Sequence, residues 1–209
     1  MRIRHRGQSP RIDPTAFAAP TAVLVGKVTV GPRARILYGA VLDSEGSRVE
    51  VGEASIVSEN AVLRATAVGA VDAPVLLADH VFVGPHATLL GCTVESGAFL
   101  GTGATVLQGA VVRSGGVVGV GALVHARTVV PGGVFVPPNA VALGDPLRIY
   151  GPGDGESLVR AIQEIEFSRT AFGVEVSGRE RHAIYEDVTE TRSAEYAAHL
   201  DDEVLGDAE

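Results

Sequence analysis

Residues 94–141 read VESGAFLGTGATVLQGAVVRSGGVVGVGALVHARTVVPGGVFVPPNAV, and an aliphatic residue returns in them at every sixth position. The returning residues are Val94, Leu100, Val106, Val112, Val118, Val124, Val130 and Val136. Two positions before each return, from Leu100 onward, the residue is small or β-branched: Ala98, Ala104, Ala110, Gly116, Ala122, Thr128 and Val134. A helix would bring apolar residues back at three and four positions, whereas this period indicates short strands separated by turns. The pattern predicts a parallel β-helix in which three hexads form one triangular coil.

The same lattice extends toward the N-terminus with two interruptions. It stops at Asp43 and resumes at Val51, and it stops again at Arg64 and resumes at Leu77. Interruptions of a solenoid predict loops on one face, which is often the functional face. The sequence therefore places candidate working loops at these two points.

The periodicity divides the chain into three parts. We expect a lead-in at residues 1–16, the β-helix at 17–150, and a C-terminal helical segment at 151–209 that ends in a mobile acidic tail from Asp201. The apolar residues at helical spacing in the first expected helix are Leu158, Ile162, Ile165 and Phe172. A second helix is expected over residues 179–200, and its candidate contacts with the solenoid are Ile184, Val188, Ala197 and Leu200.

Composition excludes several classes of function. Aromatic residues make up 5% of the chain and tryptophan is absent, which suits a narrow prism filled by Val, Ile, Leu and Ala. A net charge of −8 argues against nucleic acid, whose binding depends on Lys and Arg. The single cysteine, Cys92, excludes an intrachain disulfide and is compatible with a reducing compartment. Without a run of about 20 apolar residues or a signal-peptide core, the expectation is a cytoplasmic protein with no membrane partner.

Several short motifs carry a resemblance to a known family. They are Val30-Gly31, Ala40-Val41-Leu42, Val51-Gly52, Asn60-Ala61-Val62, Val83-Gly84, Gly91-Cys92-Thr93-Val94 and Gly144-Asp145-Pro146. With the five-residue step from Leu89 to Val94, residues 17–150 resemble the γ-class carbonic anhydrases. The resemblance implies a left-handed β-helix that forms a homotrimer, or a mixed trimer with an active homologue. It also implies three histidines that bind a divalent metal between two subunits, where metal-bound hydroxide attacks carbon dioxide.

The residues that stand at the implied ligand positions are Arg64, Pro85 and Leu90, and none of them can bind zinc. We hypothesise that the guanidinium of Arg64 stands where the metal stood. A candidate intersubunit cleft then comprises Asp43, Glu45, Ser58, Glu59, Arg64 and His86. The competing interpretation of its charged residues is an ion network at the trimer interface.

The remaining reactive side chains give no stronger signal. The six histidines, whose spacing is not typical of a metal triad, are His5, His80, His86, His125, His182 and His199. Cys92 takes a small inward position, so we expect a packed thiol rather than a nucleophile. We therefore predict no metal and no cofactor, and zinc is not expected.

Three functions follow from these observations. The first is a binding or scaffold protein that has lost zinc hydration. The second is a coenzyme A-dependent acyltransferase of the hexapeptide-repeat class, with His86 as general base and His125 in reserve. The third is a new reaction in the cleft, in which Arg64 binds a small anionic ligand and Glu59 or Glu45 moves a proton.

Overall fold

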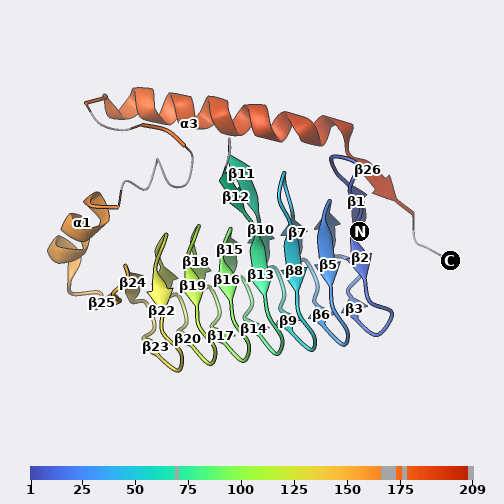
Figure 1. The fold of residues 1–209 in the computed structure, drawn as a ribbon, viewed down its shortest axis with the longest axis horizontal. Coiled ribbons are helices and arrows are strands. Elements are labelled where there is room, and N and C mark those ends of the chain that lie inside the picture. Colours follow the sequence, from blue (N-terminus) through green and yellow to red (C-terminus); the bar gives the residue numbers. More distant parts are fainter. Residues whose placement is uncertain (69–70, 166–172, 176–177, 207–209) are drawn as a thin grey trace.

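The computed structural model describes residues 1–68, 71–165, 173–175 and 178–206. Its body is a solenoid whose short parallel strands lie in three sheets, one on each side of a prism (Figure 1). Residues one coil apart pair in register, as Val94 does with Val112 and Val112 with Val130. The six-residue period of the sequence is therefore confirmed, because three hexads make one coil.

Sheet 1 contains the first strand of every coil. Its parallel strands are β1 (Arg2–Arg4), β4 (Val23–Val25), β7 (Val41–Asp43), β10 (Val62–Arg64), β15 (Thr88–Leu90), β18 (Thr105–Val106), β21 (Leu123–Val124) and β24 (Val141–Leu143). Two antiparallel strands close its ends: β26 (Glu203–Leu205) pairs with β1, and β25 (Arg148–Tyr150) pairs with β24. These additions cover both edges of the sheet, which would otherwise present unpaired backbone groups.

Sheets 2 and 3 complete the coils. Sheet 2 consists of β2 (Arg11–Ile12), β5 (Val28–Val30), β8 (Val49–Val51), β13 (Val75–Leu77), β16 (Thr93–Val94), β19 (Val111–Val112) and β22 (Val129–Val130). Sheet 3 consists of β3 (Phe17–Ala18), β6 (Arg35–Ile36), β9 (Ile56–Val57), β14 (Phe82–Val83), β17 (Phe99–Leu100), β20 (Val117–Val118) and β23 (Phe135–Val136). Because β1 and β2 form part of the first coil, the solenoid begins before the expected boundary at residue 17.

The core of the solenoid is a set of stacked aliphatic columns. In sheet 1 the inward, fully buried column is Leu24, Leu42, Leu63, Leu89, Val106 and Val124. The small residues two positions earlier are also buried: Ala22, Ala40, Ala61, Ala87, Ala104 and Ala122. Strand side chains alternate between the two faces, so both members of each hexad point inward and the smaller one fits the narrow corner.

Both interruptions of the lattice lie at the corner between sheet 1 and sheet 2. The first is the loop that joins β7 to β8, and the second is the hairpin of β11 (Thr66–Val68) and β12 (Val71–Ala73) between β10 and β13. The hairpin projects from the solenoid toward the C-terminal helix (Figure 1). The sequence thus located both loops correctly, and they lie on the same side of the molecule.

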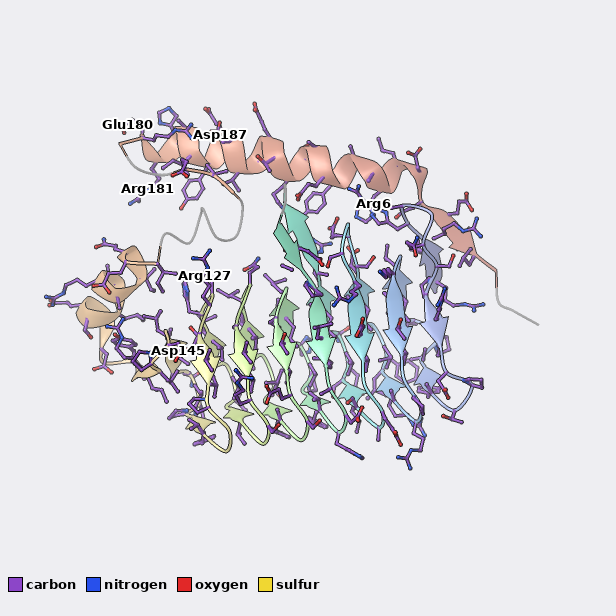
Figure 2. The ribbon with its side chains drawn as sticks, viewed as in Figure 1. Arg6, Arg127, Asp145, Glu180, Arg181 and Asp187 are labelled. Carbon is purple, nitrogen blue, oxygen red and sulfur yellow. The ribbon has the colours of Figure 1, made fainter. Side chains whose placement is uncertain are left out.

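The C-terminal segment returns along the solenoid. After α1 (Gly155–Gln163), the helix α3 (Arg181–Tyr196) runs the length of the solenoid across the ends of the strands and leads into the short helix η1 (Ala197–Asp201) (Figure 1). Figure 2 shows Arg6, in the first coil, beneath the C-terminal end of α3. None of the described helices is long and apolar enough to cross a membrane.

Two expectations for this segment are wrong, and one lies outside the described residues. The tail is not wholly mobile, because Glu203–Leu205 form β26 and pair with β1. Leu200 does not pack on the solenoid, because its side chain is 88% exposed. Phe172 belongs to the segment that the structure does not describe.

Candidate functional site

The loop after β7 buries two carboxylates at the corner between sheets 1 and 2. The backbone N–H of Glu45 donates to Asp43 Oδ1 at 2.9 Å, and Glu45 itself has φ of +47°. This tight turn directs both side chains into the structure, where each is only 4% exposed. Ser44 between them accepts the N–H of Lys27 through its hydroxyl at 2.9 Å, which ties the loop to the preceding coil.

Arg64, the last residue of β10, lies beside these carboxylates. It pairs in register with Asp43 of β7, and its Nη2 donates to Asp43 Oδ2 at 3.2 Å. Its Nε lies 3.6 Å from Glu45 Oε1, and its Nη1 donates to the hydroxyl of Tyr196 at 3.1 Å. The hypothesis that Arg64 joins Asp43 and Glu45 is therefore consistent with the geometry of a single chain.

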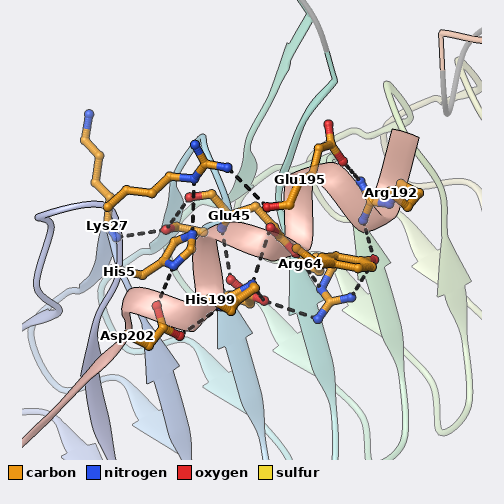
Figure 3. Close-up of polar contacts among 12 residues, drawn as sticks. His5, Lys27, Glu45, Arg64, Arg192, Glu195, His199 and Asp202 are labelled. Atoms are coloured by element: carbon orange, nitrogen blue, oxygen red, sulfur yellow. Dashed lines mark hydrogen bonds and ion pairs between the residues drawn. The ribbon is translucent and has the colours of Figure 1, made fainter. Parts of the chain in front are cut away.

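The C-terminal segment places His199 beside His5 of the first coil, next to the two carboxylates (Figure 3). His5 Nδ1 lies 2.6 Å from Asp202 Oδ1, and His199 Nδ1 lies 2.9 Å from Asp202 Oδ2. The two imidazole rings stack with centroids 4.2 Å apart and an interplanar angle of 21°. His199 Nε2 lies 3.5 Å from Glu45 Oε2, so the carboxylates of the loop and of the C-terminal segment flank the stacked rings on two sides.

The first turn of the chain positions His5. Arg6 and Gly7 both have positive φ and form the tight turn after β1. His5 lies just before this turn, and its side chain is fully buried. A Cβ added at Gly26 would clash with Ser44 Oγ and lie 3.3 Å from the Cβ of His5, so this glycine lets His5 and the loop after β7 pack closely together.

The end of α3 encloses the site on the side of Arg64. Arg192 Nη1 pairs with Glu195 at 2.6 Å, and its Nη2 donates to the Tyr196 hydroxyl at 2.6 Å. The Tyr196 ring also lies 4.6 Å from the guanidinium carbon of Arg192 and 5.3 Å from that of Arg64. Both distances are within the range of cation–π attraction.

Burial and charge shift the protonation of three groups here. Burial, together with the charge of Asp43, raises the pKa of Glu45, although the cation of Arg64 opposes the shift. Burial alone would lower the pKa of His199, but its bond to Asp202 and the charges of Asp43 and Glu45 outweigh it and raise the pKa. Burial would raise the pKa of Asp202, yet the hydrogen bonds from His199 and His5 lower it.

The other cleft candidates lie at a different corner of the solenoid. Ser58 and Glu59 follow β9 and precede β10. The turn of His86 lies one coil further on, and its backbone N–H donates to the carbonyl of Glu59 at 2.9 Å. They therefore lie at the start of the sheet 1 strands, whereas Arg64 lies at the end of one. His86 is an exposed turn residue with φ of +58°. That these residues complete a cleft between subunits stays a prediction.

The three positions that the resemblance assigns to metal ligands do not fit zinc. Arg64 and Leu90 are neighbours in register on β10 and β15, while Pro85 lies in the turn after β14. An arginine remains protonated, and neither a proline ring nor a leucine side chain has a lone pair to donate. Zinc requires thiolate, imidazole or carboxylate ligands, so these three residues cannot form the metal site that the resemblance implies.

Among the described residues, one group of metal-binding type does come together elsewhere. It consists of His5, Glu45 and His199, whose potential ligand atoms lie within 4.8 Å of one another. Sequence reasoning found Glu45 but missed both histidines and Asp202. His5 and His199 lie near opposite ends of the chain, so no local spacing could indicate that they meet. The i, i+3 relation of His199 and Asp202 was the available local signal.

The two remaining reactive residues are buried. His125 directly follows β21 in sheet 1 and is 5% exposed, and burial lowers its pKa. Cys92 is 2% exposed, and burial raises the pKa of its thiol to about 12. The thiol belongs to the core, as the inward position in its hexad predicted.

No family model matches the chain. It is 38% identical over 101 residues to the protein named gamma carbonic anhydrase 2, mitochondrial, of Arabidopsis thaliana, and the match covers 47% of this chain and 36% of that one. With gamma carbonic anhydrase 1 of the same plant it is 40% identical over 102 residues, which is 47% of this chain and 37% of that one. The matches thus span well under half of the length of these curated relatives.

A solved structure matches nearly the whole chain. It is a hexapeptide transferase family protein from Anaplasma phagocytophilum, with a TM-score of 0.51, 22% identity and coverage of 94% of this chain and 95% of that one. This likeness, together with the three-sheet prism, defines a hexapeptide-repeat protein with a left-handed parallel β-helix. Within this class, about half of the chain is similar in sequence to the γ-class carbonic anhydrases.

Proposed function

We propose that this γ-carbonic anhydrase-like protein has lost the zinc site of its relatives and serves as a trimeric binding or scaffold protein. The observation that carries the proposal is the ion-paired guanidinium of Arg64 at an implied histidine position. This cation offsets the charges of Asp43 and Glu45, which a metal ion would otherwise be needed to offset. Their burial makes such an offset important, because an unpaired buried carboxylate is costly.

The contacts of Arg64 favour a structural role over an anion-binding role. Its guanidinium already contacts Asp43, Glu45 and the Tyr196 hydroxyl within one chain. A small anionic ligand would have to displace one of these partners. We therefore place binding to a protein partner ahead of binding to a small anion in the cleft.

The proposal includes assembly as a homotrimer. Its variant is a mixed trimer of this chain with an active homologue. Ser58, Glu59 and His86 lie at another corner from Arg64, so only a second protomer could bring such a corner to it. Size-exclusion chromatography with light scattering should give about three times the 21.5 kDa chain mass. A monomeric mass at micromolar concentration would contradict the trimer.

Carbon dioxide hydration tests the loss of activity directly. Stopped-flow assays of the full chain, with and without added Zn²⁺, are expected to give the uncatalysed rate in both cases. The His5→Ala variant belongs in the same assay, because it removes a possible metal ligand outside the ancestral positions. Zinc-dependent hydration by the wild type, abolished by a chelator, would overturn the proposal.

The acyltransferase alternative has less support from the geometry. Burial lowers the pKa of His125, which favours the neutral imidazole that a general base requires. The same burial separates His125 from solvent and so from a substrate. His86 is exposed at a turn, where a substrate could reach it. A rise in Tm on addition of coenzyme A, lost in His86→Ala, would favour this alternative, since a ligand that binds only the folded state stabilises it.

A further inference from the structure

The carboxylate of Asp202 holds two imidazoles in the same orientation. Its two oxygens contact Nδ1 of His5 and Nδ1 of His199, at 2.6 and 2.9 Å. A histidine that donates its Nδ1–H in this way keeps a lone pair on Nε2, on the other side of the ring. Metal-binding histidines commonly have this arrangement, in which a carboxylate fixes the tautomer and the ring.

Glu45 supplies a third donor on the Nε2 side of the rings. Its Oε2 lies 3.5 Å from His199 Nε2, while its enclosed Oε1 accepts no hydrogen bond and lies 3.6 Å from Nε of Arg64. The side chain is 4% exposed, so solvent does not compensate this oxygen fully. Oε1 therefore faces the cation of Arg64, and Oε2 is the oxygen that faces the imidazole of His199.

We propose that His5, Glu45 and His199 of a single chain bind a divalent transition metal such as zinc, with Asp202 as a positioning residue. Two imidazoles and a carboxylate are an established zinc donor set. Ligands of tetrahedral zinc lie about 3.3 Å apart, so donors that are now within 4.8 Å need only small side-chain rotations. The site uses none of the positions Arg64, Pro85 and Leu90, but it shares Glu45 with the ion pairs of Arg64.

Its location assigns the metal a structural role. The three ligands come from the turn after β1, the loop after β7 and the helix η1, so one ion would join the first coils to the C-terminal segment (Figure 3). The His5 side chain is fully buried and Glu45 nearly so, which leaves little access for a substrate. Asp43 Oδ2 lies 3.9 Å from His199 Nε2 and can close the fourth position. The exposed side chain of Arg6, whose Nε donates to His5 Nε2 at 3.3 Å, must then move away.

The test is a metal titration of the 209-residue chain after treatment with a chelator. Competition of Zn²⁺ with a chromophoric chelator should show one tight site per chain, and Co²⁺ should give the visible absorption of a four-coordinate ion. We expect His5→Ala and His199→Ala each to weaken Zn²⁺ binding at least about 100-fold. The matched controls His86→Ala and His182→Ala, at exposed histidines, should bind as the wild type does.

A positioning role for Asp202 has its own signature. Asp202→Asn should retain the site but weaken it about 10- to 100-fold, as changes to carboxylates behind histidine ligands do, and should shift the Co²⁺ spectrum. Circular dichroism identifies any histidine variant that fails to fold. If one does, the isosteric variant Glu45→Gln is used instead, and its Zn²⁺ binding is compared with that of the wild type. Absence of a stoichiometric site in the wild type, or its retention in His5→Ala or His199→Ala, would overturn the proposal. Either result leaves the hydration assay unaffected.

Discussion

Arg64 faces Asp43 in the register of β10 and β7, and its Nη2 donates to Asp43 Oδ2 across 3.2 Å. The same guanidinium reaches Glu45, so one partly exposed cation serves two buried carboxylates. A buried charge that loses its partner is strongly destabilising. The stability of this corner therefore depends on a residue type that cannot bind a metal.

Replacing Arg64 by alanine should lower the free energy of unfolding by about 1–3 kcal/mol, which is less than a fully buried pair because the arginine is 34% exposed. Urea unfolding measures the change. Arg33→Ala is the matched control, because Arg33 pairs with Glu53 at the surface, and it should cost at most about 1 kcal/mol. Equal losses of unfolding free energy in the two variants would show that the ion pairs of Arg64 stabilise the protein no more than a surface ion pair does.

Two adjacent leucines test the inward and outward faces of the solenoid. Leu89 is fully buried in the sheet 1 column, whereas Leu90 on the next position is only partly buried. Leu89→Ala should cost about 2–5 kcal/mol, because it removes buried methyl groups and leaves a cavity. Leu90→Ala should cost at most about 1 kcal/mol. Chemical denaturation of both variants measures the contrast, and a larger loss for Leu90 would contradict the register.

Cys92 should be unreactive in the folded protein. Burial raises its pKa from 9.0 to about 12, so the thiol remains protonated at pH 8 and is shielded from reagents. A chromogenic disulfide reagent should label it only after unfolding in guanidinium chloride. Stoichiometric labelling of the native protein at pH 8 would show that the thiol is accessible.

The same shift predicts a pH dependence of stability. Because the folded pKa is above the unfolded one, the contribution of Cys92 is complete below about pH 9 and is lost as the pH rises toward about 12. The difference in unfolding free energy between the wild type and Cys92→Ala should therefore fall across this window. A difference that stays constant would contradict the raised pKa.

The strand β26 should protect the molecule from association. A chain that ends at Asp202 lacks β26 and leaves the outer edge of β1 unpaired, so it should form larger species at high concentration. A chain that ends at Gly206 retains β26 and is the control. Dynamic light scattering compares the two, and equal hydrodynamic radii at every concentration would rule out this role for β26.

The sequence predicted what depends on local periodicity. The columns through Val94, Val112 and Val130 follow from the hexads alone, because each coil repeats the same spacing. The loops after β7 and β10 were equally visible as breaks. Of the residues grouped there, Asp43, Glu45 and Arg64 lie together in one chain, whereas Glu59 lies at another corner.

The histidine side of the site could not be predicted in the same way. His5 and His199 meet only because α3 runs back along the whole solenoid and β26 pairs with β1. That return path depends on tertiary packing, which leaves no period in the sequence. The same reason explains why Leu200 was wrongly expected to contact the solenoid. Its helical spacing gave no information about which face of the segment would meet the solenoid.

The pairing of Arg2 with Leu205 also has a consequence for synthesis on the ribosome. The strand β1 emerges before the rest of the solenoid, but its outer partner emerges roughly 200 residues later. At translation rates of about 5–20 residues per second, that edge stays open for roughly 10–40 s in the nascent chain. During this interval a chaperone or another nascent copy has access to a surface that the finished protein conceals.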